Sequence, residues 1–284
     1  EIKNIATRVQ KMWNVPAMAV TVVKDGETIF AQGMGKLRAE ENAPLADAYT
    51  LFVNASTSKA FTAALLGIVV DMGYVKWTDR VTDHLSDFQL YDPWVTENYL
   101  VQDIMNHKTG FLPQALDVIP ALGYGRDDLY HMFRLVRPSS SFRTTYSYCN
   151  ALYTIAARIV EKYTGLTWEK ALEEYIFKPL EMDHTTTGKD HYFTAENFAY
   201  GYRLSKTSQG LMLTPRDDRD DSYAWLQAVS PAAFVMSNAN DMGQWMKMWL
   251  ANGKYKDKQI LSEETVKYLF SPQTICSWDN ERVV

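Results

Sequence analysis

The sequence of 284 residues has few cysteines, no long apolar run and no cluster of basic residues. Its two cysteines, Cys149 and Cys276, cannot build the disulfide framework of a small secreted domain, and no C-x-x-C or Cys/His spacing indicates zinc. The longest apolar stretch, 60–70, is too short to span a bilayer and contains Thr62 and Gly67. The sequence therefore predicts no metal site and no transmembrane segment.

The charge balance is mildly acidic, with 29 Lys and Arg against 34 Asp and Glu and a formal net charge of −5 at pH 7. Proteins that bind DNA or RNA need a basic patch to neutralise phosphates, and none is evident here. With 46% hydrophobic and 22% charged residues, the chain has the composition of a folded globular protein. We therefore expect no nucleic-acid partner, and we interpret the charged run at 216–221 as a solvated loop.

The spacing of apolar residues predicts the organisation of the chain. An amphipathic helix is expected at the N-terminus, and a buried helix at 60–72 that ends at Gly73. Two β-type runs, 17–23 and 28–32, are joined by Lys24-Asp25-Gly26-Glu27 and predict a hairpin. Further helices are expected at 101–107, 127–135, 151–163, 168–177, 240–250 and 261–270. We divide the chain into an α/β part at 1–73, a mainly helical subdomain at 74–226 and an incomplete return to the α/β part at 227–284.

The first chemical motif, Ser56-Thr57-Ser58-Lys59, stands at the start of the predicted buried helix. A lysine three residues after a serine lies on the same helix face, one turn away. Burial would lower the pKa of the lysine, so that its neutral amine could take the proton of the serine hydroxyl. Backbone N–H groups at the helix start would lie near a developing oxyanion. An N-cap serine with an exposed lysine is the alternative interpretation.

The second motif, Tyr148-Cys149-Asn150, follows a Pro- and Ser-rich loop and precedes a predicted helix. A tyrosine on a loop can shuttle a proton if a neighbouring ammonium lowers its pKa. An asparagine two residues later can offer its side-chain amide to a substrate carbonyl. The alternative is a packed tyrosine followed by an N-cap asparagine.

In their order and spacing, these motifs resemble the serine β-lactamase-like superfamily. It includes class C β-lactamases, penicillin-binding D-Ala-D-Ala carboxypeptidases, D-aminopeptidases and related esterases. The resemblance extends from about 15 to 270 and implies an α+β fold, in which an antiparallel sheet is flanked by helices and joined by a mainly helical subdomain. The matching segments are 52–62, 79–85, 104–111 with its H-x-T-G turn, Tyr148-Cys149-Asn150, and 231–242.

The resemblance implies roles for five residues. Ser56 would be the acylated nucleophile, Lys59 its base partner, and Tyr148 the residue that passes a proton to the leaving group. Asn150 would hold the substrate amide, and Gln114 would reach the cleft from the loop after the H-x-T-G turn. The histidine of that turn, His107, is expected to be structural.

The implied function is that of a metal- and cofactor-independent serine hydrolase that forms an acyl-enzyme with an amide or ester. A β-lactam, a D-amino-acid peptide and a small ester all remain open as the small-molecule or peptide substrate, because pocket shape decides among them. The resemblance also favours an extracytoplasmic or secreted location.

Three departures from the superfamily pattern stand out, and the first of them favours the alternative, a catalytically silent scaffold, binding or sensor protein. The third motif of the superfamily, K-T-G or H-x-G on a strand, is absent, since Lys108-Thr109-Gly110 belongs to the earlier turn. The P-A-G-G segment reads Pro231-Ala232-Ala233-Phe234, which reduces backbone freedom. Cys149 replaces a small residue beside the cleft. Retention of the serine, lysine, tyrosine and asparagine together favours the enzyme.

The sheet of the resembled fold takes two N-terminal and about three C-terminal strands. After the helix expected at 261–270, residues 271–284 are too few for three strands of about five residues each. A two-stranded sheet would expose an apolar face and an open edge. We therefore expect a C-terminal continuation, a second polypeptide or a swapped neighbour to complete the sheet.

Overall fold

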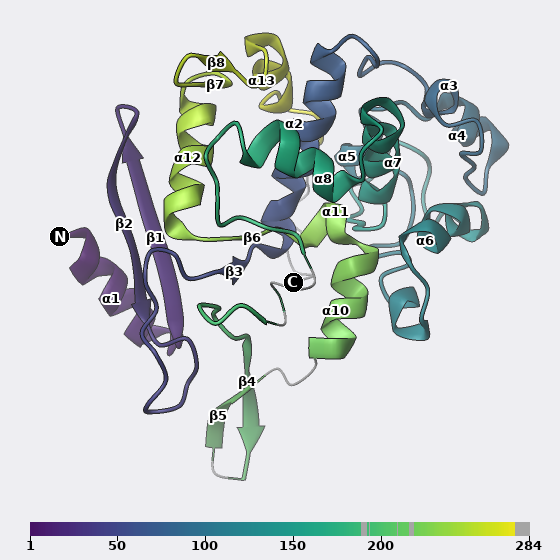
Figure 1. Cartoon of the computed structure of the whole chain (residues 1–284). Helices are drawn as coiled ribbons and strands as arrows, with labels where there is room; N and C mark the ends of the chain where they lie inside the picture. Colours follow the sequence, from purple (N-terminus) through teal and green to yellow (C-terminus); the bar gives the residue numbers. More distant parts are fainter. Residues whose placement is uncertain (189–191, 193, 209, 216–218, 276–284) are drawn as a thin grey trace. The chain divides into compact units, whose positions relative to one another are not determined.

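The computed structural model describes residues 1–188, 192, 194–208, 210–215 and 219–275. Its elements form an α+β fold (Figure 1), and their contacts divide the chain into two units. The first unit comprises Glu1–Asn54, Phe177–Asp220 and Val235–Ile260, and the second comprises Ala55–Ile176, Asp221–Phe234 and Leu261–Val284. Each unit is therefore assembled from stretches that are far apart in the sequence.

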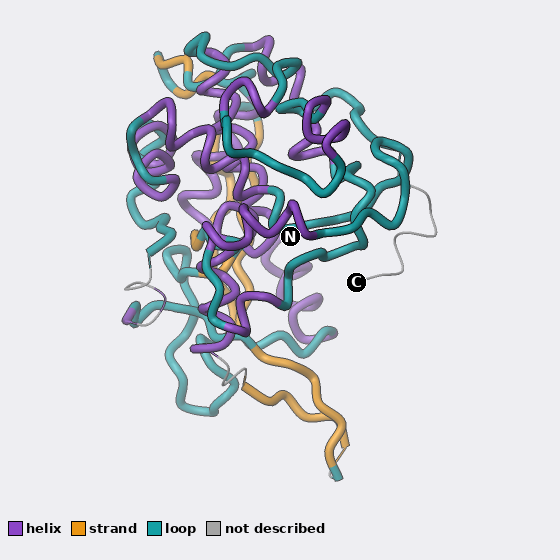
Figure 2. Tube along the Cα trace, turned by 90° about the vertical axis from the view of Figure 1, so that its right-hand side faces the viewer, coloured by secondary structure: helices purple, strands orange, loops and turns teal. Residues whose placement is uncertain are grey.

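The first unit contains the strands, which pair antiparallel in four separate two-stranded sheets within the described residues (Figure 2). Its strands are β1 (Ala17–Lys24), β2 (Glu27–Gly35), β3 (Phe52–Val53), β4 (Tyr202–Thr207), β5 (Gly210–Pro215), β6 (Met236–Ser237), β7 (Lys254–Tyr255) and β8 (Lys258–Gln259). The pairs are β1–β2, β3–β6, β4–β5 and β7–β8. Its helices are α1 (Ile2–Met12) and α12 (Ala239–Leu250).

The predicted N-terminal hairpin is confirmed as β1–β2, which pair from Ala17 opposite Gly35 to Lys24 opposite Glu27 with one shift of register between Val22 and Val23. Asp25 and Gly26 have φ of 51° and 79°, and these positive values give the twist that a two-residue hairpin turn needs. Within the described residues, β1 and β2 pair only with each other. Completion of this sheet by further strands stays a prediction.

Helix α12 packs against this hairpin through a glycine. A Cβ at Gly243 would lie 3.1 Å from the Thr28 Oγ1 atom, so the close approach of the helix to the strand leaves little room for a side chain. The helix begins where Asn238 accepts a hydrogen bond from the Asp241 backbone N–H at 3.0 Å. The predicted helix at 240–250 is thereby confirmed.

The second unit is helical. Its elements are the 3₁₀ turns η1 (Ala55–Thr57), η2 (Ile119–Leu122) and η3 (Phe133–Leu135), and the helices α2 (Ser58–Asp71), α3 (Val81–His84), α4 (Pro93–Asn98), α5 (Asp103–Asn106), α6 (Arg126–Met132), α7 (Tyr153–Thr164), α8 (Trp168–Leu172), α11 (Ser230–Ala233) and α13 (Glu263–Leu269). The π-helical turn η4 (Glu173–Phe177) and helix α10 (Arg219–Ala228) extend across its boundaries with the first unit.

Helix α2 lies in the core of the helical unit. Its residues Phe61, Leu65, Leu66 and Val69 are fully buried, and it packs against α7, α8, α11 and α13. Gly73, with φ of 79°, follows its end as predicted. Although α2 follows the hairpin in the sequence, its contacts therefore group it with the helices, because it is apolar on every side and needs partners all round.

The β4–β5 hairpin lies at 202–215, within the stretch that the sequence analysis expected to be mainly helical. Its signals are local: Tyr202 and Leu204 alternate with polar residues in β4, and Gly210 takes a φ of 105° where β5 begins. The predicted helix at 168–177 is α8 followed by the π-helical turn η4. Residues 216–218 of the charged run lie outside the described residues, and its last three residues begin α10. Cys276 also lies outside them.

Candidate active site

Ser56 and Lys59 stand where the chain enters the buried helix. Ser56 lies in η1 and is exposed, whereas Lys59 is the second residue of α2 and is only 9% exposed. The spacing predicted that they share one helix face, and the Lys59 Nζ atom is 3.3 Å from the Ser56 Oγ atom. An accessible hydroxyl is thus paired with a shielded amine. The exposed lysine of the alternative interpretation is not found.

The residue before Ser56 has an unusual backbone. Ala55 has a φ of 45°, a left-handed conformation that an alanine adopts at a cost of about 1 kcal/mol or more. Ala55 begins η1, the turn that carries Ser56, two residues after β3 ends at Val53. The strained residue is therefore adjacent to the candidate nucleophile.

Lys59 donates hydrogen bonds to three oxygen atoms. Besides Ser56 Oγ, its Nζ atom is 2.7 Å from the Asn150 Oδ1 atom and 3.1 Å from the Ala232 carbonyl oxygen. All three acceptors are uncharged groups, so the amine is anchored without a direct ion pair. The amine is therefore aligned with the serine hydroxyl.

Burial lowers the pKa of Lys59 from its ordinary value of 10.5 to about 8. The negative charge of Asp117 raises the pKa of Lys59, but burial is the larger effect. At pH 7 about one-tenth of the lysine would then be neutral, and at higher pH most of it would be. A neutral amine in this position can accept the serine proton.

Tyr148 lies on the other side of the serine, with its hydroxyl oxygen 2.6 Å from Ser56 Oγ. Its ring also faces the lysine, since Lys59 Nζ is 4.6 Å from the ring centroid. Burial raises the pKa of Tyr148, although the hydrogen bond with Ser56 lowers it. This differs from the lowered pKa that a tyrosine proton shuttle was expected to need. Desolvation of the phenol is the largest effect, so Tyr148 keeps its hydroxyl proton at neutral pH.

His107 holds the backbone of the tyrosine loop. It ends α5 in a left-handed conformation, and its carbonyl accepts from Ser147 N–H at 2.7 Å. Its Nδ1 atom accepts from Cys149 N–H at 3.2 Å, and burial lowers its pKa to about 4, so the ring is neutral. Its ring packs on that of Tyr148 at 4.8 Å between centroids. These contacts hold the backbone around Tyr148, and a purely structural role for His107 stays a prediction.

Asn150 bridges Lys59 and a carboxylate that the sequence analysis did not name. Its Oδ1 atom accepts from Lys59, and its Nδ2 atom donates to Asp117 Oδ2 at 2.6 Å. Gln114, expected at the cleft, has an exposed side chain, and its backbone N–H donates to the Tyr148 carbonyl at 2.6 Å. Asp117 stands three residues later in an irregular loop, where no spacing or periodicity distinguishes it.

The comparisons with known proteins identify the family. The sequence model of the family described as Beta-lactamase matches residues 5–275. The chain belongs to the Beta-lactamase family.

Three curated relatives illustrate its range. Unguisins hydrolase from Aspergillus campestris is 29% identical over 278 residues, which cover 93% of this chain and 48% of the relative. Penicillin-binding protein 4 from Amycolatopsis lactamdurans is 28% identical, with 86% of this chain and 62% of the relative covered. A beta-lactamase from Yersinia enterocolitica is 26% identical, with 92% and 64% covered. The chain thus spans about half the length of the unguisins hydrolase.

A solved structure shows that the fold is shared as well. The octameric penicillin-binding protein homologue from Pyrococcus abyssi superposes with a TM-score of 0.73 at 20% sequence identity. The match covers 93% of this chain and 58% of that chain. The α+β fold expected from the sequence motifs is therefore confirmed.

In this member of the Beta-lactamase family, two hydrogen bonds join helix α11 to α2 beside the candidate site. Its Ala232 carbonyl accepts from Lys59, and its Pro231 carbonyl accepts from Thr62 Oγ1 at 2.6 Å. Thr62 also accepts a hydrogen bond from the indole N–H of Trp168 at 3.0 Å. The short helix α11 therefore supplies a fixed acceptor to the lysine.

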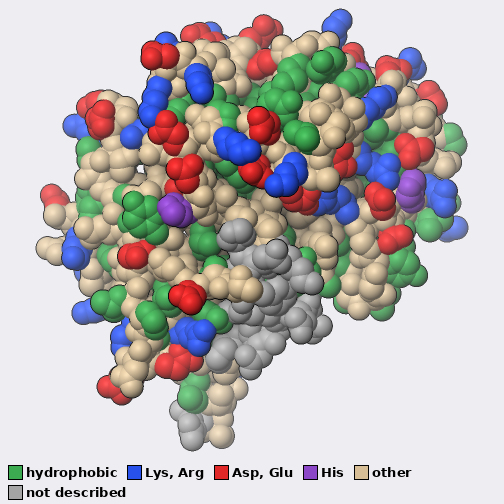
Figure 3. Space-filling view, viewed as in Figure 1, with side chains coloured by type: hydrophobic (Ala, Val, Ile, Leu, Met, Phe, Trp, Pro, Cys, Tyr) green, Lys and Arg blue, Asp and Glu red, His purple; other side chains and the backbone are tan. Residues whose placement is uncertain are grey.

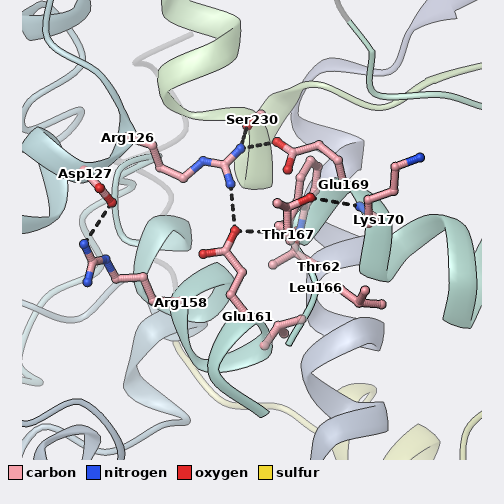
Figure 4. Close-up of polar contacts among 12 residues, drawn as sticks. Thr62, Arg126, Asp127, Arg158, Glu161, Leu166, Thr167, Glu169, Lys170 and Ser230 are labelled. Carbon is pink, nitrogen blue, oxygen red and sulfur yellow. Dashed lines mark hydrogen bonds and ion pairs between the residues drawn. The ribbon is translucent and has the colours of Figure 1, made fainter. Parts of the chain in front are cut away.

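A charged cluster contacts the first residue of α11 (Figure 4). The Arg126 guanidinium hydrogen-bonds Ser230 at the start of α11 and forms ion pairs with Glu161 and Glu169. Glu161 also accepts from the backbone N–H of Trp168 at 3.0 Å. Through these contacts Arg126 connects α6 with α7, α8 and α11, and the last three of these helices pack against α2.

Some predictions concern what the chain does not bind. Among the described residues, no three His, Cys, Asp or Glu side chains gather where they could hold a metal ion. No helix in this part of the chain is long and apolar enough to cross a bilayer. On the face shown in Figure 3, acidic and basic side chains are interspersed. The absence of a nucleic-acid partner stays a prediction.

Proposed function

We propose that this protein is a serine hydrolase that forms an acyl-enzyme on Ser56 with an amide or ester substrate. The observation that carries the proposal is the position of the Ser56 hydroxyl, 2.6 Å from the Tyr148 hydroxyl and 3.3 Å from Lys59 Nζ. A serine hydroxyl is a weak nucleophile and needs such a base within hydrogen-bond reach. Membership of the Beta-lactamase family and similarity to a relative named as a hydrolase support the proposal.

In the proposed acylation step, the neutral amine of Lys59 takes the proton of Ser56 as Oγ attacks the substrate carbonyl carbon. The carbonyl oxygen becomes an oxyanion, to which the Ser56 backbone N–H would donate. When the tetrahedral intermediate collapses, the bond to the leaving group breaks and that group takes a proton from Tyr148 or Lys59. The remaining N–H of Asn150 would orient the substrate amide.

In the proposed deacylation step, a water molecule attacks the ester carbon of the acyl-enzyme. The same basic groups take its proton, and Ser56 Oγ leaves with a proton restored. The products are the carboxylic acid and the free enzyme. The substrate class, whether β-lactam, D-amino-acid peptide or small ester, depends on the shape of the pocket and stays open.

Intact mass spectrometry tests the proposal directly. The protein is incubated with a fluorophosphonate and, separately, with a fluorescent penicillin. We expect a covalent adduct of one probe molecule per chain, lost in Ser56→Ala and retained in Ser86→Ala, which removes an exposed serine hydroxyl from the same unit. An adduct that persists in Ser56→Ala would show that Ser56 is not the nucleophile. The absence of any adduct with both probes would favour the silent scaffold.

A further inference from the structure

Asp117 contacts the candidate site without touching Ser56. It lies just before η2, and its Oδ2 atom accepts a hydrogen bond from Asn150 Nδ2 at 2.6 Å. Its Oδ1 atom is buried and has no hydrogen-bond partner among the described residues. A buried carboxylate oxygen without a hydrogen-bond partner lowers the stability of the fold. We therefore expect Asp117 to have a role other than stabilising the fold.

The hydrogen bonds on both sides of Asn150 determine the orientation of its amide. A carboxylate only accepts hydrogen bonds and a lysine ammonium only donates them. The amide nitrogen must therefore face Asp117, and the amide oxygen must face Lys59, as the distances of 2.6 and 2.7 Å show. If the amide were flipped, its N–H groups would point at the lysine and its oxygen at the carboxylate. Asp117 thus excludes the flipped orientation.

We propose that Asp117 is a positioning residue for the reaction proposed above. It keeps the Asn150 amide oxygen directed at the Lys59 amine, and its negative charge stabilises the protonated form of that amine. This inference rests on the proposed function of Ser56 and Lys59. Asp117 affects Lys59 in two ways: its hydrogen bond orients Asn150, which contacts the lysine, and its negative charge acts on the lysine directly through space.

Five described titratable groups surround Lys59, and Asp117 is the carboxylate among them. The others are the Cys149 thiol and the Tyr148 hydroxyl from the loop before α7, the Tyr153 hydroxyl from α7, and the His107 imidazole at the end of α5. Burial raises the pKa of Cys149 to about 12, raises those of both tyrosines and lowers that of His107 to about 4. These four groups are therefore uncharged at neutral pH.

The charge of Asp117 opposes the effect of burial on Lys59. Burial lowers the pKa of the lysine, and Asp117 raises it. Conversely, burial raises the pKa of Asp117, while the hydrogen bond from Asn150 and the charge of Lys59 lower it. Removing the carboxylate charge should therefore lower the pKa of Lys59 further and lower the pH at which the neutral amine forms.

The Asp117→Asn variant tests both effects, with Asp127→Asn as control, since Asp127 is 82% exposed in the same unit. The rate at which the fluorophosphonate phosphonylates Ser56, with release of fluoride, is measured from pH 5 to 10 and stands for the acylation rate, since both steps need removal of the serine proton. We expect Asp117→Asn to lower the rate at high pH roughly 10- to 100-fold through misorientation of the lysine, and to move the acidic limb of the profile to lower pH. A lower rate without a shift of the acidic limb of the pH–rate profile would overturn the electrostatic part of the proposal.

Titration of Lys59 by NMR on lysine-labelled protein supplies a readout that needs no turnover. The Lys59 signal is assigned from its loss in Lys59→Met. We expect its midpoint to fall in Asp117→Asn and to stay unchanged in Asp127→Asn. An unchanged midpoint in Asp117→Asn would refute the effect on Lys59 even if Ser56 never reacts, so that this failure is distinct from failure of the proposed function.

A double-variant cycle with Asn150→Ala tests the geometric effect. At a pH well above the pKa of Lys59, we expect Asp117→Asn to reduce the acylation rate no further once Asn150→Ala is present. If the loss of rate in the double variant equalled the product of the losses in the two single variants, Asp117 would not act through Asn150. If Asp117→Asn does not fold by circular dichroism, Asp117→Ser, whose hydroxyl can also accept from Asn150, replaces it.

Discussion

The hydroxyl oxygens of Ser56 and Tyr148 lie 2.6 Å apart, although the two residues are 92 positions apart in the sequence. The same tyrosine ring faces the Lys59 amine, 4.6 Å from its centroid. Serine, tyrosine and lysine therefore form one hydrogen-bonded group, in which the tyrosine remains protonated and the lysine readily loses its proton. The proposed reaction divides its proton transfers between these two neighbours of the serine.

The first prediction concerns the pH dependence of acylation. Because burial lowers the pKa of Lys59 to about 8, the acylation rate of the unmodified protein should rise with pH to a midpoint near that value. Lys59→Ala should lower the rate by roughly 10²- to 10⁴-fold and remove this limb. Stopped-flow measurement of Ser56 phosphonylation by the fluorophosphonate, which needs the same removal of the serine proton, checks both, with circular dichroism as a control for folding. Near-normal rates in Lys59→Ala would exclude Lys59 as the base that activates Ser56.

The second prediction concerns Tyr148. Tyr148→Phe keeps the ring that packs on His107 and Lys59 but removes the hydroxyl beside Ser56. Acylation should slow by roughly 10- to 100-fold, less than in Lys59→Ala, because the lysine can take over part of the proton transfer. Tyr124→Phe, at an exposed tyrosine of the same unit, should have the normal rate. Equal rates in both variants would remove Tyr148 from the mechanism.

The third prediction concerns stability against pH. The unfolded chain keeps the Lys59 proton up to its ordinary pKa of 10.5, whereas the folded protein releases it at about 8. Between these values the unfolded state binds more protons, so the free energy of unfolding should rise with pH. Relative to Lys59→Met, which has no amine to titrate, the rise should approach roughly 3 kcal/mol. Urea unfolding at pH 7 to 10.5 measures it, and a constant difference would contradict the burial of the amine.

The fourth prediction concerns the cluster around Arg126. The Arg126 side chain is 19% exposed and pairs with two carboxylates. Arg126→Met would leave both without their partner and should lower the free energy of unfolding by about 1–3 kcal/mol. Lys170→Met removes an exposed ion pair with Glu173 and should change it by less than about 0.5 kcal/mol. Similar losses in urea unfolding of the two variants would show that the cluster in Figure 4 contributes no more than a surface pair.

The sequence alone determined the features that depend on neighbouring residues. The apolar run after Ser56 predicts helix α2, and the three-residue spacing places Lys59 on the serine side of its first turn. Asp25 and Gly26 predict the turn of the first hairpin for the same local reason. The β4–β5 hairpin, which was not predicted, carries local signals as well, in the alternation of Tyr202 and Leu204 with polar residues along β4 and in Gly210.

Only the tertiary structure decided what surrounds the lysine. Asn150 and Ala232 are 91 and 173 residues from Lys59, and Asp117 reaches it through Asn150 from an irregular loop without periodicity. The lowered pKa of Lys59 and the raised pKa of Tyr148 both result from burial, which depends on how the helices and loops pack. Residue types and spacing specify which groups are available for chemistry, whereas long-range packing specifies their distances and their solvation.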